Sequence, residues 1–158
     1  MRYTWDHGVV ALDGERVAST GDAFWGRSPD LEVDGAPWAF RVDVDGMRAE
    51  RPDGPAIVIE RGAPWRARSP MSGPSGRTDL NRSTSWLLGK LHFDVERAGA
   101  VIGEVSPVGP WRYRPVLELQ RPLSHAEAVF LLWAAYRIND TRPVARINAG
   151  PGFASAGG

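Results

Sequence analysis

The sequence contains no cysteine among its 158 residues. This absence excludes disulfide bonds, thiolate zinc sites and cysteine nucleophiles together. Lysine is nearly absent as well, because 18 of the 19 basic residues are arginine and Lys90 is the exception. A chain without cysteine suits a reducing compartment, and we predict a cytoplasmic protein.

Long apolar runs are also missing. No segment approaches the roughly 20 apolar residues that a membrane-spanning helix requires. The first residues include Asp6 and His7 where a signal peptide needs an unbroken apolar run. We therefore predict one globular domain over residues 1–142, followed by a flexible tail of small residues over 143–158.

Motifs for metal binding and catalysis are absent too. The histidines His7, His92 and His125 are scattered and have no zinc-binding spacing. "RVDVDGMRAERP" places Arg41 and Pro52 where a calcium loop needs oxygen ligands. "GPSGRT" has the wrong glycine spacing for a phosphate loop, and no Gly-x-Ser-x-Gly elbow exists. We predict no metal, no cofactor and no catalytic activity.

The formal net charge is zero, but the charges are unevenly distributed. Residues 1–60 contain 12 acids and 6 bases, a balance of −6, and residues 61–158 contain 7 acids and 13 bases, a balance of +6. Such asymmetry indicates either a binding surface or the pairing of two halves within one chain.

Short strands and tight turns dominate the chain before residue 120. Asp-Gly recurs at 13–14, 34–35, 45–46 and 53–54, and this dipeptide favours the positive φ angles of hairpin turns. We expect another turn at Ala98–Gly99. Ten to twelve candidate strands follow from the alternation between the turns, which predicts an antiparallel all-β organisation.

Two stretches interrupt this regular pattern. The segment 68–85, "RSPMSGPSGRTDLNRSTS", is rich in Ser, Gly, Pro and Arg, and we expect a long loop there. The segment 111–119 alternates as a strand, but it contains Pro115. Proline cannot donate to a ladder, so this strand is expected at a sheet edge or with a bulge.

A single helix is predicted near the end of the chain, over residues 125–138. Ser124 and Glu127 have the spacing of a capping box, and Asn139 and Asp140 mark the stop. Every residue from Ala128 to Tyr136 is apolar, so the helix has no polar face and must be buried. About 14 residues extend only about 21 Å, which is too short for a bilayer.

The sheet must bury this helix, because no second helix is predicted. A helix with its side chains is about 10–12 Å wide, and a barrel of about eleven or more strands can enclose one. We therefore predict a mainly β fold: a closed antiparallel β-barrel of eleven to twelve strands around a buried C-terminal helix. The competing arrangement is a sheet curled over one side of the helix, with a dimer partner over the other.

This organisation resembles the tubby-like fold, in particular its scramblase-like and LURP-one-related branch, which includes small bacterial members. The resemblance covers about residues 5–140 and depends on "LDGERVA", "DVDGMRAE" and "LSHAEAVFLLWAAYRIN". It implies a helix-filled barrel, with phosphoinositide or membrane-surface binding in some eukaryotic members. It implies no chemistry for the bacterial ones. The phosphoinositide site of the family is not carried over, because its basic residues have no matching positions here.

Arginines in the second half are the candidates for binding an anion, since a guanidinium group binds phosphate well. The candidates are Arg66, Arg68, Arg77, Arg82, Arg112 and Arg114. If they converged near one rim of the barrel, they could hold an anionic headgroup. The alternative is a set of solvated arginines that pair with the acidic first half.

The predicted function is that of a non-catalytic binding module, peripheral to a membrane, with anionic lipid headgroups or an acidic protein surface as partner. One alternative is a structural protein that forms a homodimer or larger homo-oligomer through its acidic and basic halves. Another is a small-molecule-binding barrel, which a helix-filled lumen disfavours. Nucleic acid is not expected, because the net charge is zero and no aromatic-basic platform is evident.

Overall fold

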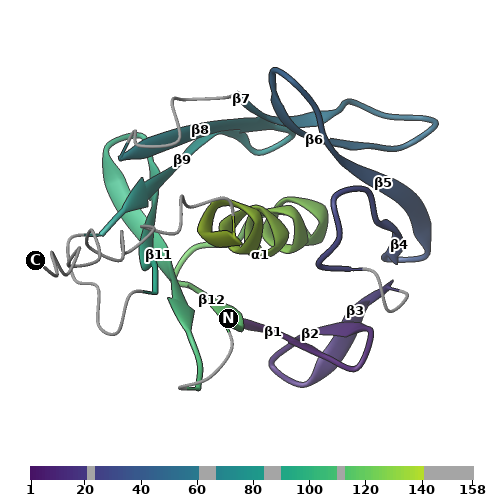
Figure 1. Ribbon diagram of the computed structural model, residues 1–158, viewed down its shortest axis with the longest axis horizontal. Helices are drawn as coiled ribbons and strands as arrows, with labels where there is room; N and C mark the ends of the chain where they lie inside the picture. Colours follow the sequence, from purple (N-terminus) through teal and green to yellow (C-terminus); the bar gives the residue numbers. More distant parts are fainter. Residues whose placement is uncertain (21–23, 61–66, 84–89, 110–112, 141–158) are drawn as a thin grey trace, which may run out of the picture.

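The structure, a computed structural model, is a closed barrel of antiparallel strands with one helix inside it (Figure 1). It describes residues 1–20, 24–60, 67–83, 90–109 and 113–140. Each strand pairs with its neighbours in the sequence, and the first strand pairs with the last. The predicted fold class is confirmed, and the described residues form twelve strands.

The strands are short, and most are joined by brief connections. Their bounds are β1 Arg2–Asp6, β2 Val9–Leu12, β3 Glu15–Thr20, β4 Asp30–Val33, β5 Ala36–Val42, β6 Gly46–Glu50, β7 Ile57–Glu60, β8 Arg68–Gly73, β9 Gly76–Arg82, β10 Phe93–Arg97, β11 Ala100–Pro107 and β12 Pro115–Leu119. The helix α1 spans His125–Asp140.

The barrel is closed without help from a second chain. Strand β1 pairs with β12 through Arg2 opposite Glu118 and Tyr3 opposite Leu117. The sheet therefore surrounds the helix completely, and the alternative of a curled sheet completed by a dimer partner is wrong. Closure also leaves no strand edge open for pairing.

Three of the expected hairpin turns have the predicted backbone conformation. Both residues of Asp13–Gly14, Asp34–Gly35 and Ala98–Gly99 have positive φ angles, from 49° to 93°. The other two Asp-Gly pairs differ, because Gly46 begins β6 and residues 53–54 lie within the longer connection between β6 and β7.

The prediction of a long loop over 68–85 is wrong for most of that segment. Strands β8 and β9 form a hairpin there, with Pro74 and Ser75 between them. Met71, Thr78 and Leu80 point into the core and are at most 1% exposed. Ser, Gly and Pro disfavour strands locally, but pairing with β7 and β10 on either side overrides this preference.

Pro115 occupies a place in the ladder that tolerates proline. It is the first residue of β12 and lies opposite Pro107, the last residue of β11. Neither a sheet edge nor a bulge within β12 is needed, because a proline at the first position of a strand removes no ladder bond. The observed strand begins at Pro115 and not at 111 as predicted: residues 113–114 are not part of it, and residues 111–112 lie outside the described ranges.

The helix provides the core of the barrel, as predicted from its apolar sequence. Every residue from Ala128 to Ala135 is fully buried. On one side Phe130 and Trp133 pack against Phe40 of β5, with ring centroids 5.2 and 5.5 Å away. The indole nitrogen of Trp133 donates to the carbonyl oxygen of Gly26 at 3.0 Å. No helix in the described part of the chain is long and apolar enough to cross a membrane.

The helix start is held by the predicted capping box. The backbone N–H of Ser124 donates to Glu127 Oε2 at 3.1 Å, and the N–H of Glu127 donates to Ser124 Oγ at 3.3 Å. Glu127 also accepts a bond from the N–H of Ser75, at 2.9 Å, and one from its hydroxyl. One buried carboxylate thus joins the helix to the β8–β9 turn.

Candidate binding surface

The topology creates two different rims. Successive strands run in opposite directions, so alternate connections meet at the same end of the barrel. At one end, which we call the helix-start rim, lie the turns at 13–14, 34–35, 74–75 and 98–99 and the beginning of α1. At the other, the helix-end rim, α1 ends, as do β1, β3, β5, β7, β9 and β11.

The predicted anion-binding arginines divide between these rims. Arg68 begins β8, Arg82 ends β9 and Arg114 directly precedes β12, so all three lie at the helix-end rim. Arg77 is the second residue of β9, next to the β8–β9 turn, and therefore lies at the helix-start rim. Arg66 and Arg112 lie outside the described residues.

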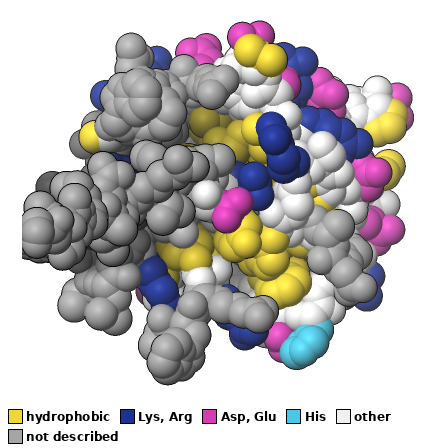
Figure 2. Space-filling view, in the orientation of Figure 1, with side chains coloured by type: hydrophobic (Ala, Val, Ile, Leu, Met, Phe, Trp, Pro, Cys, Tyr) yellow, Lys and Arg dark blue, Asp and Glu magenta, His cyan; other side chains and the backbone are white. Residues whose placement is uncertain are grey.

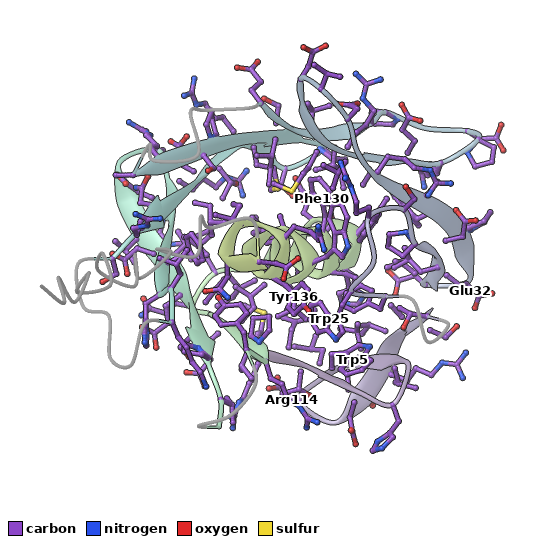
Figure 3. The ribbon with its side chains drawn as sticks, in the orientation of Figure 1. Trp5, Trp25, Glu32, Arg114, Phe130 and Tyr136 are labelled. Atoms are coloured by element: carbon purple, nitrogen blue, oxygen red, sulfur yellow. The ribbon has the colours of Figure 1, made fainter. Side chains whose placement is uncertain are left out.

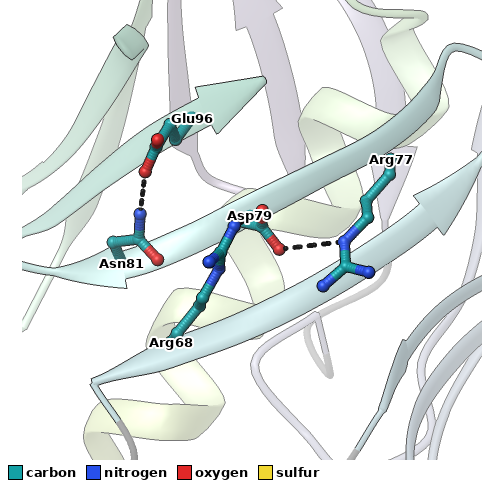
Figure 4. Close-up of polar contacts among 5 residues, drawn as sticks. All are labelled: Arg68, Arg77, Asp79, Asn81 and Glu96. Carbon is teal, nitrogen blue, oxygen red and sulfur yellow. Dashed lines mark hydrogen bonds and ion pairs between the residues drawn. The ribbon is translucent and has the colours of Figure 1, made fainter. Parts of the chain in front are cut away.

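Arg68 and Arg77 converge on a carboxylate of their own sheet. Both side chains form ion pairs with Asp79 of β9, the second with an Nε–Oδ1 distance of 3.4 Å (Figure 4). The Asp79 side chain is only 9% exposed. Burial raises its pKa, but the hydrogen bond and charge of Arg68 and the charge of Arg77 outweigh this effect and hold the pKa below its usual value. These two arginines therefore neutralise a nearly buried carboxylate of their own sheet.

The pairing of two oppositely charged halves explains few of the ion pairs. Among the described residues, Arg2–Glu118 at 3.4 Å and His125–Asp34 at 2.7 Å join the first 60 residues to the rest. Other pairs lie within one half, such as Arg41–Asp30 at 2.6 Å. The charge asymmetry of the sequence is thus largely uncompensated by direct contacts between the halves in this part of the chain.

Arg82 and Arg114 differ from Arg68 and Arg77 in having no side-chain partner among the described residues. Arg114 is exposed, and Arg82 is partly buried. Arg82 lies opposite Phe93, which points into the core, so its side chain leaves the sheet on the inner side at the rim. Three strand spacings separate β9 from β12, which is about 14 Å along the sheet.

The same rim carries a row of aromatic side chains that the sequence did not reveal. Trp5 and Trp25 have ring centroids 5.2 Å apart, Trp25 and Tyr136 are 4.5 Å apart, and Tyr136 and Tyr113 are 6.2 Å apart. All four are partly exposed. Figure 3 shows Trp5, Trp25 and Tyr136 beside one another next to α1, and Figure 2 shows hydrophobic side chains in the middle of this face with Lys and Arg side chains beside them.

We call this surface the basic–aromatic rim, and it consists of Arg82, Arg114, Trp5, Trp25, Tyr113 and Tyr136. Hydrogen bonds fix its strands to the helix end. The hydroxyl of Tyr113 donates to the carbonyl oxygen of Leu91 at 3.0 Å, and the N–H of Leu91 donates to Asn139 Oδ1 at 3.2 Å. The N–H of Val108 donates to the carbonyl oxygen of Arg114 at 2.8 Å. These bonds hold the Tyr113 side chain and the backbone of Arg114 in place at the rim.

The described residues offer no constellation for a metal ion, since no group of three or more His, Asp or Glu side chains is suitably placed among them. Comparisons with protein-family models, with curated proteins and with solved structures gave no match.

Proposed function

We propose that this protein is a non-catalytic binding module of tubby-like type whose basic–aromatic rim binds anionic lipid headgroups at a cytoplasmic membrane surface. The observation that supports this proposal is the meeting, at one end of the barrel, of partly exposed aromatic side chains and two arginines that have no side-chain partner in the described part of the chain. Guanidinium groups suit phosphate, and Trp and Tyr rings favour the level of the headgroups at a membrane interface.

The arginines, and not the helix, must supply the attraction for the anion. The end of α1 at this rim is its C-terminus, which carries a partial negative charge. This charge acts only within about the last turn, and Arg137 in that turn does not supply a free positive charge, because it is ion-paired with Asp140 at 3.2 Å. An anion at the rim would therefore lie towards Arg82 and Arg114 on the β9–β12 side.

The rim favours a lipid surface over the other partners that the sequence left open. An acidic protein surface would satisfy the two arginines, but it would gain less from the aromatic row. A small molecule in the lumen is disfavoured, because fully buried side chains of α1 occupy the interior. A homo-oligomer formed through opposite charges remains an outcome of the test below.

Co-sedimentation with vesicles tests the proposal. The probes are vesicles of phosphatidylcholine alone and of phosphatidylcholine with phosphatidylserine, at low and moderate salt. We expect binding to the anionic vesicles only, and weaker binding at the higher salt. Each cation near an anionic surface contributes about 1 kcal/mol, so Arg82→Gln with Arg114→Gln should weaken binding about 30-fold.

The matched control removes two exposed arginines elsewhere, Arg16→Gln with Arg121→Gln, which also have no side-chain partner among the described residues. Equal losses in both double variants would reject the rim as the site. Absence of binding to anionic vesicles at low salt would reject the lipid partner. A salt-sensitive increase of molecular mass in solution would then favour the homo-oligomer.

A further inference from the structure

A shallow groove of about 320 Å³ lies on the outer wall of the barrel, across β10, β11, β12 and β1. It is separate from the basic–aromatic rim, and the proposed function above does not use it. Its lining includes Met1, Arg2, Asp94, Val101, Glu104 and Glu118. These residues combine two apolar and three acidic side chains with one arginine.

A β-bulge shapes the groove. The register between β10 and β11 shifts after Val95, so that Val95 lies opposite Gly103 and Glu96 lies opposite Val101. The inserted residue, Ile102, points into the core and is 1% exposed. Bulges of this kind bend a strand and redirect side chains, and here Val101 is left 55% exposed on the outer wall.

The apolar side chains of the groove are unusual for this surface. Four large hydrophobic side chains are exposed in the described part of the chain: Met1, Val44, Val101 and Val108. Two of these four, Met1 at 42% and Val101 at 55%, line the groove. The groove therefore offers an apolar contact as well as charge.

A row of carboxylates crosses the groove. Asp94 of β10 lies opposite Glu104 of β11, and Glu104 lies opposite Glu118 of β12. Side chains directly opposite one another have Cβ atoms about 5 Å apart, and like charges at this spacing destabilise a sheet. Of these three acids, Glu118 alone has an ion-pair partner among the described residues.

The cations of the groove are already engaged. Arg2 lies opposite Glu118 and forms an ion pair with it at 3.4 Å. The amino group of Met1 donates to the carbonyl oxygen of Leu119 at 3.2 Å. Asp94 and Glu104 have no ionic partner among the described residues, so the middle of the row is free to attract a cation from outside.

We infer that this groove docks a basic segment of a partner protein, with one apolar side chain between Met1 and Val101 and flanking Lys or Arg side chains at Asp94 and Glu104. The barrel formed by the described strands is closed and has no free strand edge, so the segment is held by side chains and not by strand addition. A second copy related by two-fold symmetry does not fit, because the two acidic rows would face one another.

Fluorescence anisotropy with a labelled peptide tests this inference. The probe is one leucine flanked on each side by two lysines, and two control peptides carry glutamates for the lysines or serine for the leucine. We expect the first peptide to bind more tightly than either control. In the protein, Asp94→Asn with Glu104→Gln should weaken binding on the order of tenfold, the loss expected for two exposed ion pairs.

The matched control variant is Glu15→Gln with Glu32→Gln, which removes two exposed carboxylates from β3 and β4 on another part of the wall (Figure 3 labels Glu32). Affinity within twofold of the original protein in this control supports the groove. Equal losses in both double variants, unchanged affinity in the groove variant, or no binding of the lysine peptide to the original protein would each overturn the inference.

Discussion

The carboxylate of Glu127 gives the sharpest test of how the helix is held inside the barrel. This side chain is fully buried and accepts hydrogen bonds from the backbone N–H and hydroxyl of both Ser75 and Ser124. Gly73 leaves room for it, because a Cβ at Gly73 would come within 2.5 Å of Glu127 Oε1. Glu127→Ala removes the acceptor for all four donors at once.

The size of the effect follows from these contacts. Ser124 keeps its role as N-cap, but its own N–H loses the acceptor that Glu127 supplies in the capping box, which costs about 1 kcal/mol. The two donors of Ser75 would then lie in a partly buried turn without their acceptor, which costs about 1–3 kcal/mol more. We therefore expect the free energy of unfolding to fall by about 2–4 kcal/mol, a large part of the roughly 5–15 kcal/mol of a typical domain.

Urea unfolding followed by tryptophan fluorescence measures this loss. With a typical m value near 2 kcal/mol/M, the midpoint should fall by about 1–2 M. Glu32→Ala is the control, because this exposed acid has no side-chain partner among the described residues and its loss should stay within about 0.5 kcal/mol. A Glu127→Ala midpoint that matches the Glu32→Ala midpoint would refute the conclusion that this carboxylate stabilises the contact between α1 and the β8–β9 turn.

Three further predictions concern packing in the core, stability at acidic pH and charge repulsion on the outer wall. Leu131→Asp places an unpaired charge in a fully buried site and should prevent folding, as circular dichroism would reveal; a folded variant would contradict the central-helix packing. The lowered pKa of Asp79, beside Arg68 and Arg77, stabilises the fold above the unfolded pKa of about 3.9 and stops doing so as the pH falls through the folded value. The stability gap between the original protein and Asp79→Asn should therefore be present at pH 7 and narrow at pH 3, and a gap independent of pH would reject the pairing. Glu104→Gln should raise the urea midpoint at low ionic strength, with a smaller gain in high salt, since it relieves repulsion in the carboxylate row.

Local sequence patterns determined the architecture of this protein. The unbroken apolar stretch from Ala128 to Ala135 requires burial on every side, and a helix of that width requires a barrel of many strands. The capping box at Ser124 and the hairpin turns at Asp13–Gly14 and Asp34–Gly35 formed as predicted. Each of these signals acts over a few neighbouring residues or through one periodicity, so the sequence suffices to read it.

Only the tertiary structure decided where strands form in sequences with weak local preference. Strands β8 and β9 exist because β7, β10 and Glu127 supply partners that the Ser- and Gly-rich segment cannot supply for itself. The arginines were separated for the same reason. Arg77 and Arg82 lie near opposite ends of β9 and therefore at different rims, although only four residues stand between them in the chain.

The two proposed binding surfaces also depend on closure of the barrel. Trp5, Trp25 and Tyr136 come from β1, the β3–β4 connection and α1, and no sequence pattern links them. The carboxylate row needs the exact register of β10, β11 and β12, including a bulge that the sequence did not indicate. The sequence alone therefore determined that a helix is enclosed by strands, because periodicity and turn chemistry are local. Which side chains meet on the surface depends on register and strand order, which are set by packing between residues far apart in the chain.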